Sequence, residues 1–240
     1  MDAKHRHELK QDEFTLATMT LADRLAEYRT PLLIGAGVVV LVALVVGGVT
    51  VYRSQQANKA GAALGIAMAT AEAPIVPAPT LPGATQTPGS FPTLTARADA
   101  AAEAFTNVVT TYPGTDAAHA AQFQLAAQML AGGKAAEAEQ AYAAVAAGEG
   151  RTLRGQAAKL GQAEALLALG RHDEALTIYT DLAAARDGAL PVDGVLMQLA
   201  RASQRAGKTA EARAAFQRVV DEFPESPYTP AAQAEMAALN

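Results

Sequence analysis

The stretch GRHDEALTIY, residues 170–179, contains the pattern that decides the fold. The same arrangement of glycine, alanine and an aromatic residue stands in GKAAEAEQAY at residues 133–142 and in GKTAEARAAF at residues 207–216. The three glycines are 37 residues apart, and so are the three aromatic residues. Phe105 lies a further 37 residues before Tyr142, which extends the register to a fourth copy. A period this strict indicates an internal repeat.

Each copy has the spacing of a helix that packs along one face. Ala138, Tyr142 and Val145 stand at positions i, i+4 and i+7, which lie on the same side of a helix. The small alanine allows a neighbouring helix to approach, and the aromatic ring fills the space beside it. The glycine before each face ends the preceding helix, because glycine adopts the left-handed conformation at low cost. The pattern therefore predicts repeats of helix, tight turn and helix, packed through Ala138, Tyr142, Ala175, Tyr179, Ala212 and Phe216.

These elements resemble the tetratricopeptide repeat. The resemblance covers residues 94–240 and rests on the glycine of the turn, the alanine five residues later, the aromatic residue four after that, and Pro113 and Pro224 at the ends of two copies. Repeats of this family have a period of about 34 residues, so we expect the extra residues in the loops AAGEGRT (146–152) and ARDGALPV (185–192). The resemblance implies an all-α fold, an α-solenoid of helix-turn-helix repeats with period 37.

Two helix starts are expected within this register. Asp116 is the predicted N-cap of one helix, and Ser226, followed by Pro227, is the predicted N-cap of the last. The last helix is expected to run from Tyr228 to about Leu239.

An apolar segment near the N-terminus predicts a transmembrane helix over residues 31–52. Residues 32–52, LLIGAGVVVLVALVVGGVTVY, contain no charge, and a helix of this length just crosses a hydrocarbon core of roughly 30 Å. A cleavable signal peptide is the alternative, but its apolar region and leader are normally shorter. Five basic residues precede the span and two follow it closely, which favours a cytoplasmic N-terminus. If only the nearest twenty residues are counted, two basic residues lie on each side of the span.

The segments around the span have distinct compositions. Residues 1–30 form a predicted cytoplasmic tail whose apolar residues at helical spacing indicate an amphipathic helix, or simply the helical approach to the span. Residues 53–73 are an Ala-rich helix, and residues 74–93 are rich in proline, which disfavours helix. The Pro-rich run is either a stalk or a loop within the first repeat, whose first helix would then be residues 53–73. The second alternative is favoured because it gives the helix around Phe105 a partner.

Composition argues against several classes of function. The chain has no cysteine, so it has no disulfide and no thiolate metal site. The net charge is −5, and residues 94–240 carry twelve Lys and Arg against seventeen Asp and Glu, which disfavours nucleic acid as a partner. The four histidines (His5, His7, His119 and His172) have neither metal-ligand nor catalytic-triad spacing. We therefore expect no enzyme activity, no cofactor and no metal.

Binding of proteins is the remaining function, and one stripe is a candidate groove. Phe123, Leu160 and Met197 share a register position 37 residues apart, beside Arg201 and Arg205. If the stripe faces outward, it suits apolar peptide segments. If the stripe faces inward, its residues are part of the hydrophobic core. This is the favoured alternative.

The whole layout resembles the ancillary subunits of the bacterial Sec translocon. These inner-membrane proteins have a short cytoplasmic tail, one span and a periplasmic repeat domain; the matching features are the span, the Ala-rich helix and the segment YPGTDAAHAAQFQLA (112–126). The resemblance implies a single-pass protein of the inner membrane that contacts the translocon, periplasmic chaperones or secreted clients. Its function would be recruiting or holding proteins. A structural subunit of a larger membrane complex and an envelope-assembly factor remain alternatives, and homo-oligomers are left open.

Overall fold

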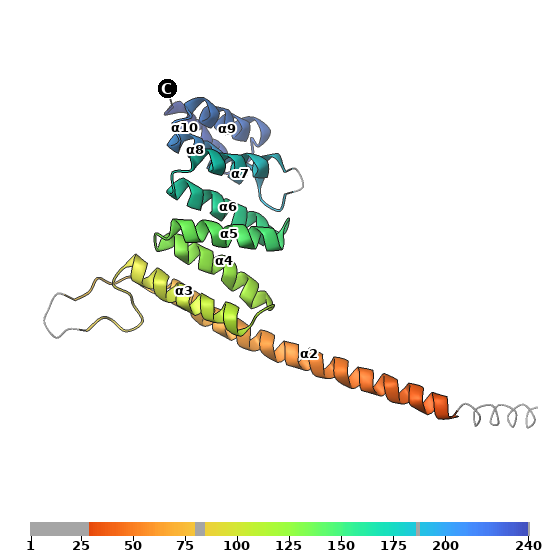
Figure 1. Ribbon diagram of the computed structural model, residues 1–240. Helices are drawn as coiled ribbons and strands as arrows, with labels where there is room; N and C mark the ends of the chain where they lie inside the picture. Colours follow the sequence, from red (N-terminus) through yellow and green to blue (C-terminus); the bar gives the residue numbers. More distant parts are fainter. Residues whose placement is uncertain (1–28, 80–84, 186–187, 240) are drawn as a thin grey trace, which may run out of the picture. The chain divides into compact units, whose positions relative to one another are not determined.

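The computed structural model describes residues 29–79, 85–185 and 188–239, with side chains from Leu33 onward (Figure 1). The predicted amphipathic helix before Arg29 and the histidines His5 and His7 lie outside these ranges. Apart from one isolated bridge, the regular structure of the described residues is α-helical, as the sequence predicted. The helices are α2 (Arg29–Ala71), α3 (Leu94–Thr111), α4 (Asp116–Ala131), α5 (Ala135–Glu149), α6 (Leu153–Ala168), α7 (His172–Ala184), α8 (Val192–Arg205), α9 (Thr209–Glu222) and α10 (Thr229–Ala237).

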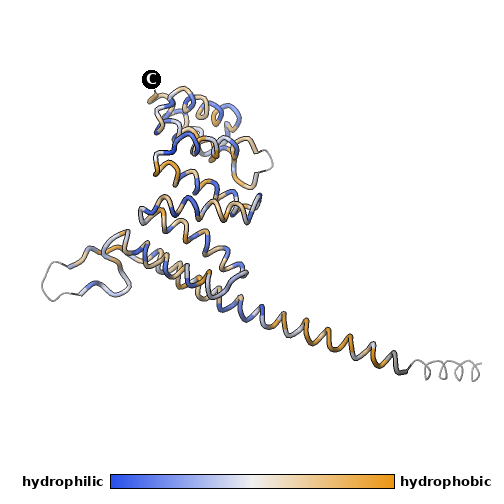
Figure 2. The backbone as a smooth tube through the Cα atoms, in the orientation of Figure 1, coloured by the Kyte–Doolittle hydropathy of each residue, from blue (hydrophilic) through white to orange (hydrophobic). Residues whose placement is uncertain are grey.

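The chain divides into two units, residues 1–55 and residues 56–240. In the first unit, the described residues belong to α2, which extends 19 residues past the predicted end of the span at Tyr52. By length and composition, the helical stretch Leu33–Ala71 qualifies as a membrane span, and its most apolar part has no buried residue. Figure 2 shows this apolar run as a continuous orange segment of α2.

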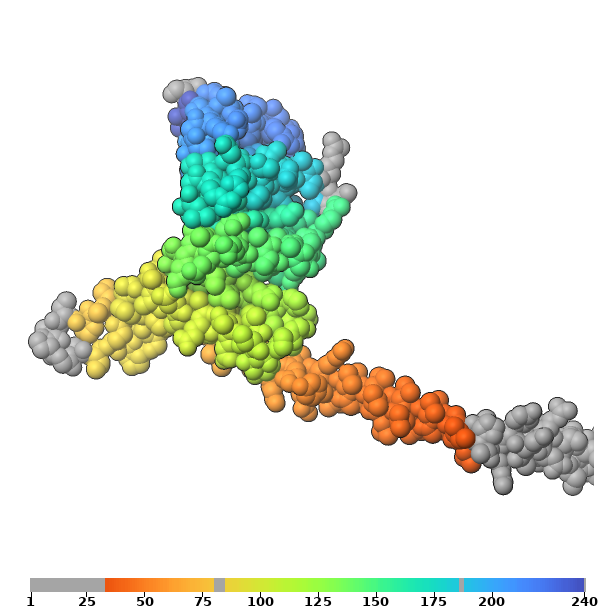
Figure 3. Space-filling model, in the orientation of Figure 1, coloured from red at the N-terminus to blue at the C-terminus, as the bar shows by residue number. Residues whose placement is uncertain are grey.

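The second unit is a solenoid of helix pairs that follow one another in chain order (Figure 3). Helices α5, α7 and α9 begin at Ala135, His172 and Thr209, which are 37 residues apart. The glycine before each of them adopts a left-handed conformation, with φ of 83° at Gly133 and 75° at Gly170. The strict period of the sequence is therefore the spacing of the second helices of successive pairs.

The first pair is formed by the end of α2 and by α3. Ala60 and Ala67 of α2 are fully buried, and Ala67 packs in one cluster with Phe105 of α3. The Pro-rich segment between these helices returns the chain to its start, because the backbone N–H of Phe91 donates to the carbonyl of Pro74 at 3.0 Å. The described residues of this segment, 74–79 and 85–93, thus begin and end beside each other between two packed helices.

Helix starts differ from the predicted ones by a few residues. The cap of α4 is Thr115, whose hydroxyl accepts the N–H of Ala118 at 3.1 Å, so the prediction of Asp116 was wrong by one residue. Thr152, 37 residues later, caps α6 in the same way. Ser226 accepts the N–H of Tyr228 at 3.1 Å, but this bond closes a turn before α10 rather than capping it.

Candidate protein-binding surface

We call the first helix of each pair an A helix (the end of α2, then α4, α6 and α8, with α10 after the last pair) and the second a B helix (α3, α5, α7 and α9). The six predicted packing residues belong to B helices, and all lie in the core. The ring of Tyr142, from α5, packs edge to face on Phe123 of α4, with centroids 5.6 Å apart. It also lies directly against α6, since a Cβ on Gly161 would come within 2.4 Å of the ring. The aromatic ring of a B helix thus fills the space between two A helices.

The predicted apolar stripe is not an exposed groove. Met197 is only 2% exposed and lies in the cluster formed by α7, α8, α9 and α10. Phe123 and Leu160 are half-buried, Phe123 on the ring of Tyr142 and Leu160 against the two C-terminal clusters. The outward-facing alternative therefore fails at Met197, because Ala232 of α10 joins the cluster that encloses this part of the stripe.

The two predicted arginines have different environments. The guanidinium of Arg201 donates twice to one carboxylate oxygen of Glu235, at 2.7 and 2.9 Å, and so joins α8 to α10. Arg205 is exposed and, within the part of the chain that the structure describes, forms no ion pair. Arg201 is therefore engaged in the fold, whereas no carboxylate of the described residues pairs with Arg205.

A polar series runs over the A helices beside Arg205. Burial, followed by the charge of Glu164, raises the pKa of Tyr142 to about 12. The pKa of Tyr179 is raised to about 12 by the same two causes and is lowered slightly by Arg205. Glu164 therefore acts electrostatically on both tyrosines, and Arg205 acts on Tyr179. The geometry agrees, because Gly161, one turn before Glu164, lies against the Tyr142 ring, and Ala163, the residue before Glu164, shares a buried cluster with Tyr179. We call Tyr142, Glu164, Tyr179 and Arg205 the A-face cluster; its members come from α5, α6, α7 and α8 in turn.

The sequence predicted Arg205 as a candidate binding residue but did not single out Glu164. A signal for Glu164 was present, because it stands 37 residues before Arg201 and therefore at the same position of its repeat. The tyrosines were predicted as packing residues only. Their rings do pack, but their hydroxyl groups have no hydrogen-bond partner among the described residues.

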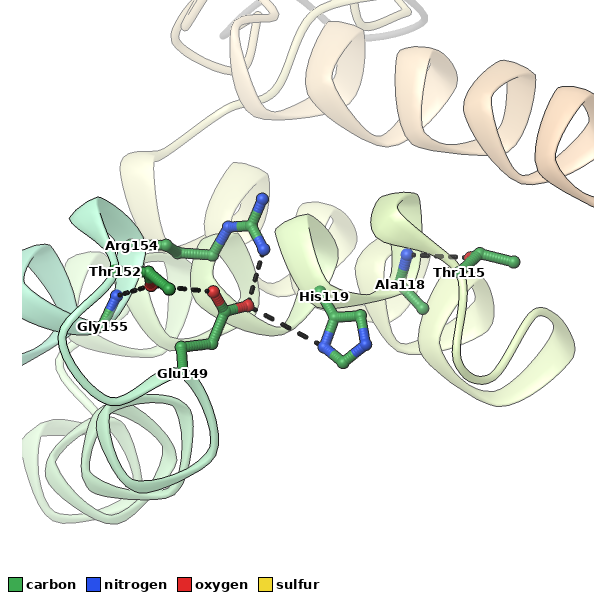
Figure 4. A network of polar contacts seen from close by, with 7 residues as sticks. All are labelled: Thr115, Ala118, His119, Glu149, Thr152, Arg154 and Gly155. Carbon is green, nitrogen blue, oxygen red and sulfur yellow. Dashed lines mark hydrogen bonds and ion pairs between the residues drawn. The ribbon is translucent and has the colours of Figure 1, made fainter.

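A second polar network joins α4, α5 and α6 and serves the fold (Figure 4). The carboxylate of Glu149 accepts a hydrogen bond from Arg154 at 2.6 Å and one from Thr152 at 3.2 Å. His119 lies 3.8 Å from the same carboxylate. In the next repeat Gln156, at the register position of His119, accepts the N–H of Ala189 at 2.8 Å. Gln156 thus holds the loop before α8, and His119 lies beside the last residue of α5.

The Glu149 network predicts a pH-dependent contribution to stability. The hydrogen bond from Arg154 holds the pKa of Glu149 below its usual value of 4.5, although burial opposes this. The stabilisation is therefore present above about pH 4.5 and is lost as the pH falls through the folded-state pKa. We expect Arg154→Gln to lower the free energy of unfolding by up to about 1 kcal/mol at pH 7, and the difference from wild type to shrink at pH 3. Urea denaturation followed by circular dichroism at both pH values measures this, with Arg151→Gln in the neighbouring exposed loop as control.

Comparison with known proteins supports the repeat fold. A family model for the tetratricopeptide repeat matches residues 157–185 and 195–226. A Podosopora anserina protein described as a kinesin light chain with nearly identical TPR-like repeats is similar in crystal structure, with a TM-score of 0.52 and 23% identity, over 60% of this chain and 77% of that one. A variant of the same protein gives the same values. No curated protein sequence matches the chain.

These likenesses agree with the helix pairs and the glycine turns. The solved structures support the solenoid fold alone, and the family model places tetratricopeptide repeats over the last two pairs. Stacked repeats of this kind bind other proteins along extended surfaces. The chain is therefore an α-solenoid in which residues 157–185 and 195–226 match the tetratricopeptide repeat, a fold typical of protein-interaction scaffolds.

Proposed function

We propose that this protein is a membrane-anchored scaffold that binds other proteins through the A helices of its solenoid. The observation that carries the proposal is the A-face cluster, in which Glu164 and Arg205 are exposed and form no ion pair within the described residues. Charges that pair with each other stabilise the fold. Charges and hydroxyl groups that have no partner among the described residues can instead bind polar groups of another protein. The apolar stretch of α2 supports the membrane anchor.

The proposed place of action is the outer face of a bacterial inner membrane. The excess of basic residues before the apolar stretch supports a cytoplasmic N-terminus and a periplasmic solenoid. The layout resembles that of ancillary Sec translocon subunits, which supports a role in holding chaperones or secreted clients near the translocation machinery. The protein binds and positions these partners and performs no chemical step.

Photo-crosslinking in cells tests this proposal. A photo-reactive amino acid in place of Ala168, which is exposed on α6 one turn after Glu164, is expected to capture translocon, chaperone or secreted proteins. The same probe in place of Asp181, exposed on the B helix α7, serves as the control and is expected to capture fewer. Equal capture from both positions, or none from Ala168, would contradict binding through the A helices. Capture of one fixed membrane subunit would favour the structural-subunit alternative.

A further inference from the structure

We propose that the A-face cluster binds an extended segment of a partner protein that carries a basic side chain opposite Glu164 and an acidic side chain opposite Arg205. The inference rests on the proposed function and adds to it the chemistry of the partner. In this arrangement, Glu164, Tyr142 and Tyr179 contact the basic side chain of the partner, and Arg205 contacts the acidic one.

The surroundings of Glu164 suit an ammonium or guanidinium group. Tyr142 and Tyr179 are 5% and 4% exposed, yet their hydroxyls have no hydrogen-bond partner in the described ranges. The end of the Tyr142 ring that bears the hydroxyl lies against Gly161, one helical turn before Glu164. A hydroxyl oxygen accepts hydrogen bonds, and a carboxylate accepts several. A basic side chain placed here would therefore meet a negative charge and two neutral acceptors.

The neighbourhood of Arg205 suits a carboxylate. Glu235, the acidic residue that contacts α8 from α10, is already bound by Arg201 and does not neutralise Arg205. At the register position of Arg205, the two preceding A helices have Ala131 and Ala168, both small and exposed. The chain of a partner can therefore pass close to these helices before it reaches the arginine. The order of charges, acid on α6 and base on α8, favours a segment with the complementary order.

The spacing of the two charges in the partner follows from helix packing. Ala163 and Leu166 of α6 share one buried cluster with Ala202 of α8 and with residues of α7, so these two A helices are neighbours in the solenoid. Packed helices have axes roughly 10 Å apart, and an extended chain rises about 3.3 Å per residue. Arg205 also lies one helical turn, about 6 Å, beyond the register position of Glu164. A segment that crosses from Glu164 to Arg205 therefore covers about 12 Å and needs about three to four residues from its basic to its acidic side chain.

Synthetic peptides bound to the full-length protein in detergent micelles test the inference. The probes are fluorescein-labelled ten-residue peptides of Ala, Ser and Gly that contain one lysine and one aspartate two to four positions apart, in both orders. In companion peptides, glutamine replaces the lysine or asparagine replaces the aspartate. Fluorescence anisotropy is expected to show that the best charged peptide binds about fivefold more tightly than either companion, as for an exposed ion pair of about 1 kcal/mol.

Variants then assign each preference to one residue. Glu164→Gln is expected to remove the preference for lysine and leave that for aspartate, and Arg205→Gln is expected to do the reverse. The matched controls Asp181→Asn and Arg151→Gln, at exposed positions outside the cluster, are expected to keep both preferences. A wild-type protein without any charge preference would overturn the inference, and so would variants of the cluster that behave like the controls.

The scaffold function and the charge preference of the A-face cluster can each be contradicted without the other. Crosslinking from Ala168 in cells together with no charge preference in vitro would overturn the inference and leave the scaffold function standing. A charge preference that depends on Glu164 and Arg205, with no crosslinking from Ala168, would count against the proposed function alone. Crosslinks from Ala168 that join two copies of this chain would overturn the assignment of the surface to a different partner protein.

Discussion

Replacing Phe216 with alanine is expected to lower the free energy of unfolding by about 3–5 kcal/mol, the range for a large aromatic residue removed from a core. Phe216 has no exposed surface and lies in the cluster shared by α7, α8, α9 and α10. Because neighbouring repeats stabilise one another through their contacts, the loss should be concentrated at the C-terminal end. Urea denaturation followed by circular dichroism measures the total, and hydrogen exchange of α8 to α10 measures its location.

The substitution Phe216→Tyr separates the size of the residue from its polarity. Tyr142 and Tyr179 occupy the same register position and are 5% and 4% exposed, whereas Phe216 is 0% exposed. A hydroxyl added at residue 216 would be buried without a partner, which costs about 1–3 kcal/mol. Tyr179→Phe removes a hydroxyl that has no partner in the described residues and should be nearly neutral. If Phe216→Tyr unfolds at the same urea concentration as wild type, the aromatic column is open to solvent at this end too.

The fold was predictable from the sequence where residues within one repeat determine the turn and the helix start of that repeat. The glycine turns and the starts of α5, α7 and α9 follow the period of 37 because local residues determine them: a left-handed glycine ends one helix and an Ala-aromatic face begins the packing of the next. The loop between α7 and α8 breaks this regularity. Helix α8 begins at Val192, 39 residues after Leu153, because seven residues separate it from the end of α7 at Ala184, whereas three separate α5 from α6.

The repeat register could not predict which helix pairs with α3. Its first helix lies before a loop of about twenty residues, so Ala60 and Ala67 do not stand at the positions that the period would give. Their burial comes from tertiary packing against α3. An Ala-rich helix has no marked apolar face, and the sequence therefore left two alternatives for residues 74–93.

The candidate surface was predictable only in part, for a related reason. Arg201 and Arg205 look alike in the sequence, but Glu235 pairs with Arg201 across 34 residues, outside the repeat register. Met197 looks equivalent to Phe123 and is instead enclosed at the end of the solenoid. Which residues of a repeat remain accessible depends on what covers each copy, and the period carries no information about that.

Gly161→Ala is expected to lower the free energy of unfolding by about 2 kcal/mol, although alanine favours a helix over glycine by about 1 kcal/mol. An ideal Cβ at residue 161 would lie 2.4 Å from the Cζ of Tyr142 and 2.5 Å from its Cε1. The ring is buried against Phe123, so it cannot move away without disturbing α4. Gly148→Ala is the matched control, because a Cβ there meets nothing within 4 Å, and it should leave stability unchanged or raise it slightly.

Two further measurements connect this prediction to the binding surface. In the background of Gly161→Ala, the smaller Tyr142→Leu should recover part of the lost stability in urea denaturation, since it removes the atoms that the new methyl group meets. Gly161→Ala alone should also weaken the preference for lysine-containing peptides, because a displaced ring takes its hydroxyl away from Glu164. A Gly161→Ala protein as stable as the Gly148→Ala control would show that the Tyr142 ring is not confined between α4 and α6, and that its hydroxyl is not held beside Glu164.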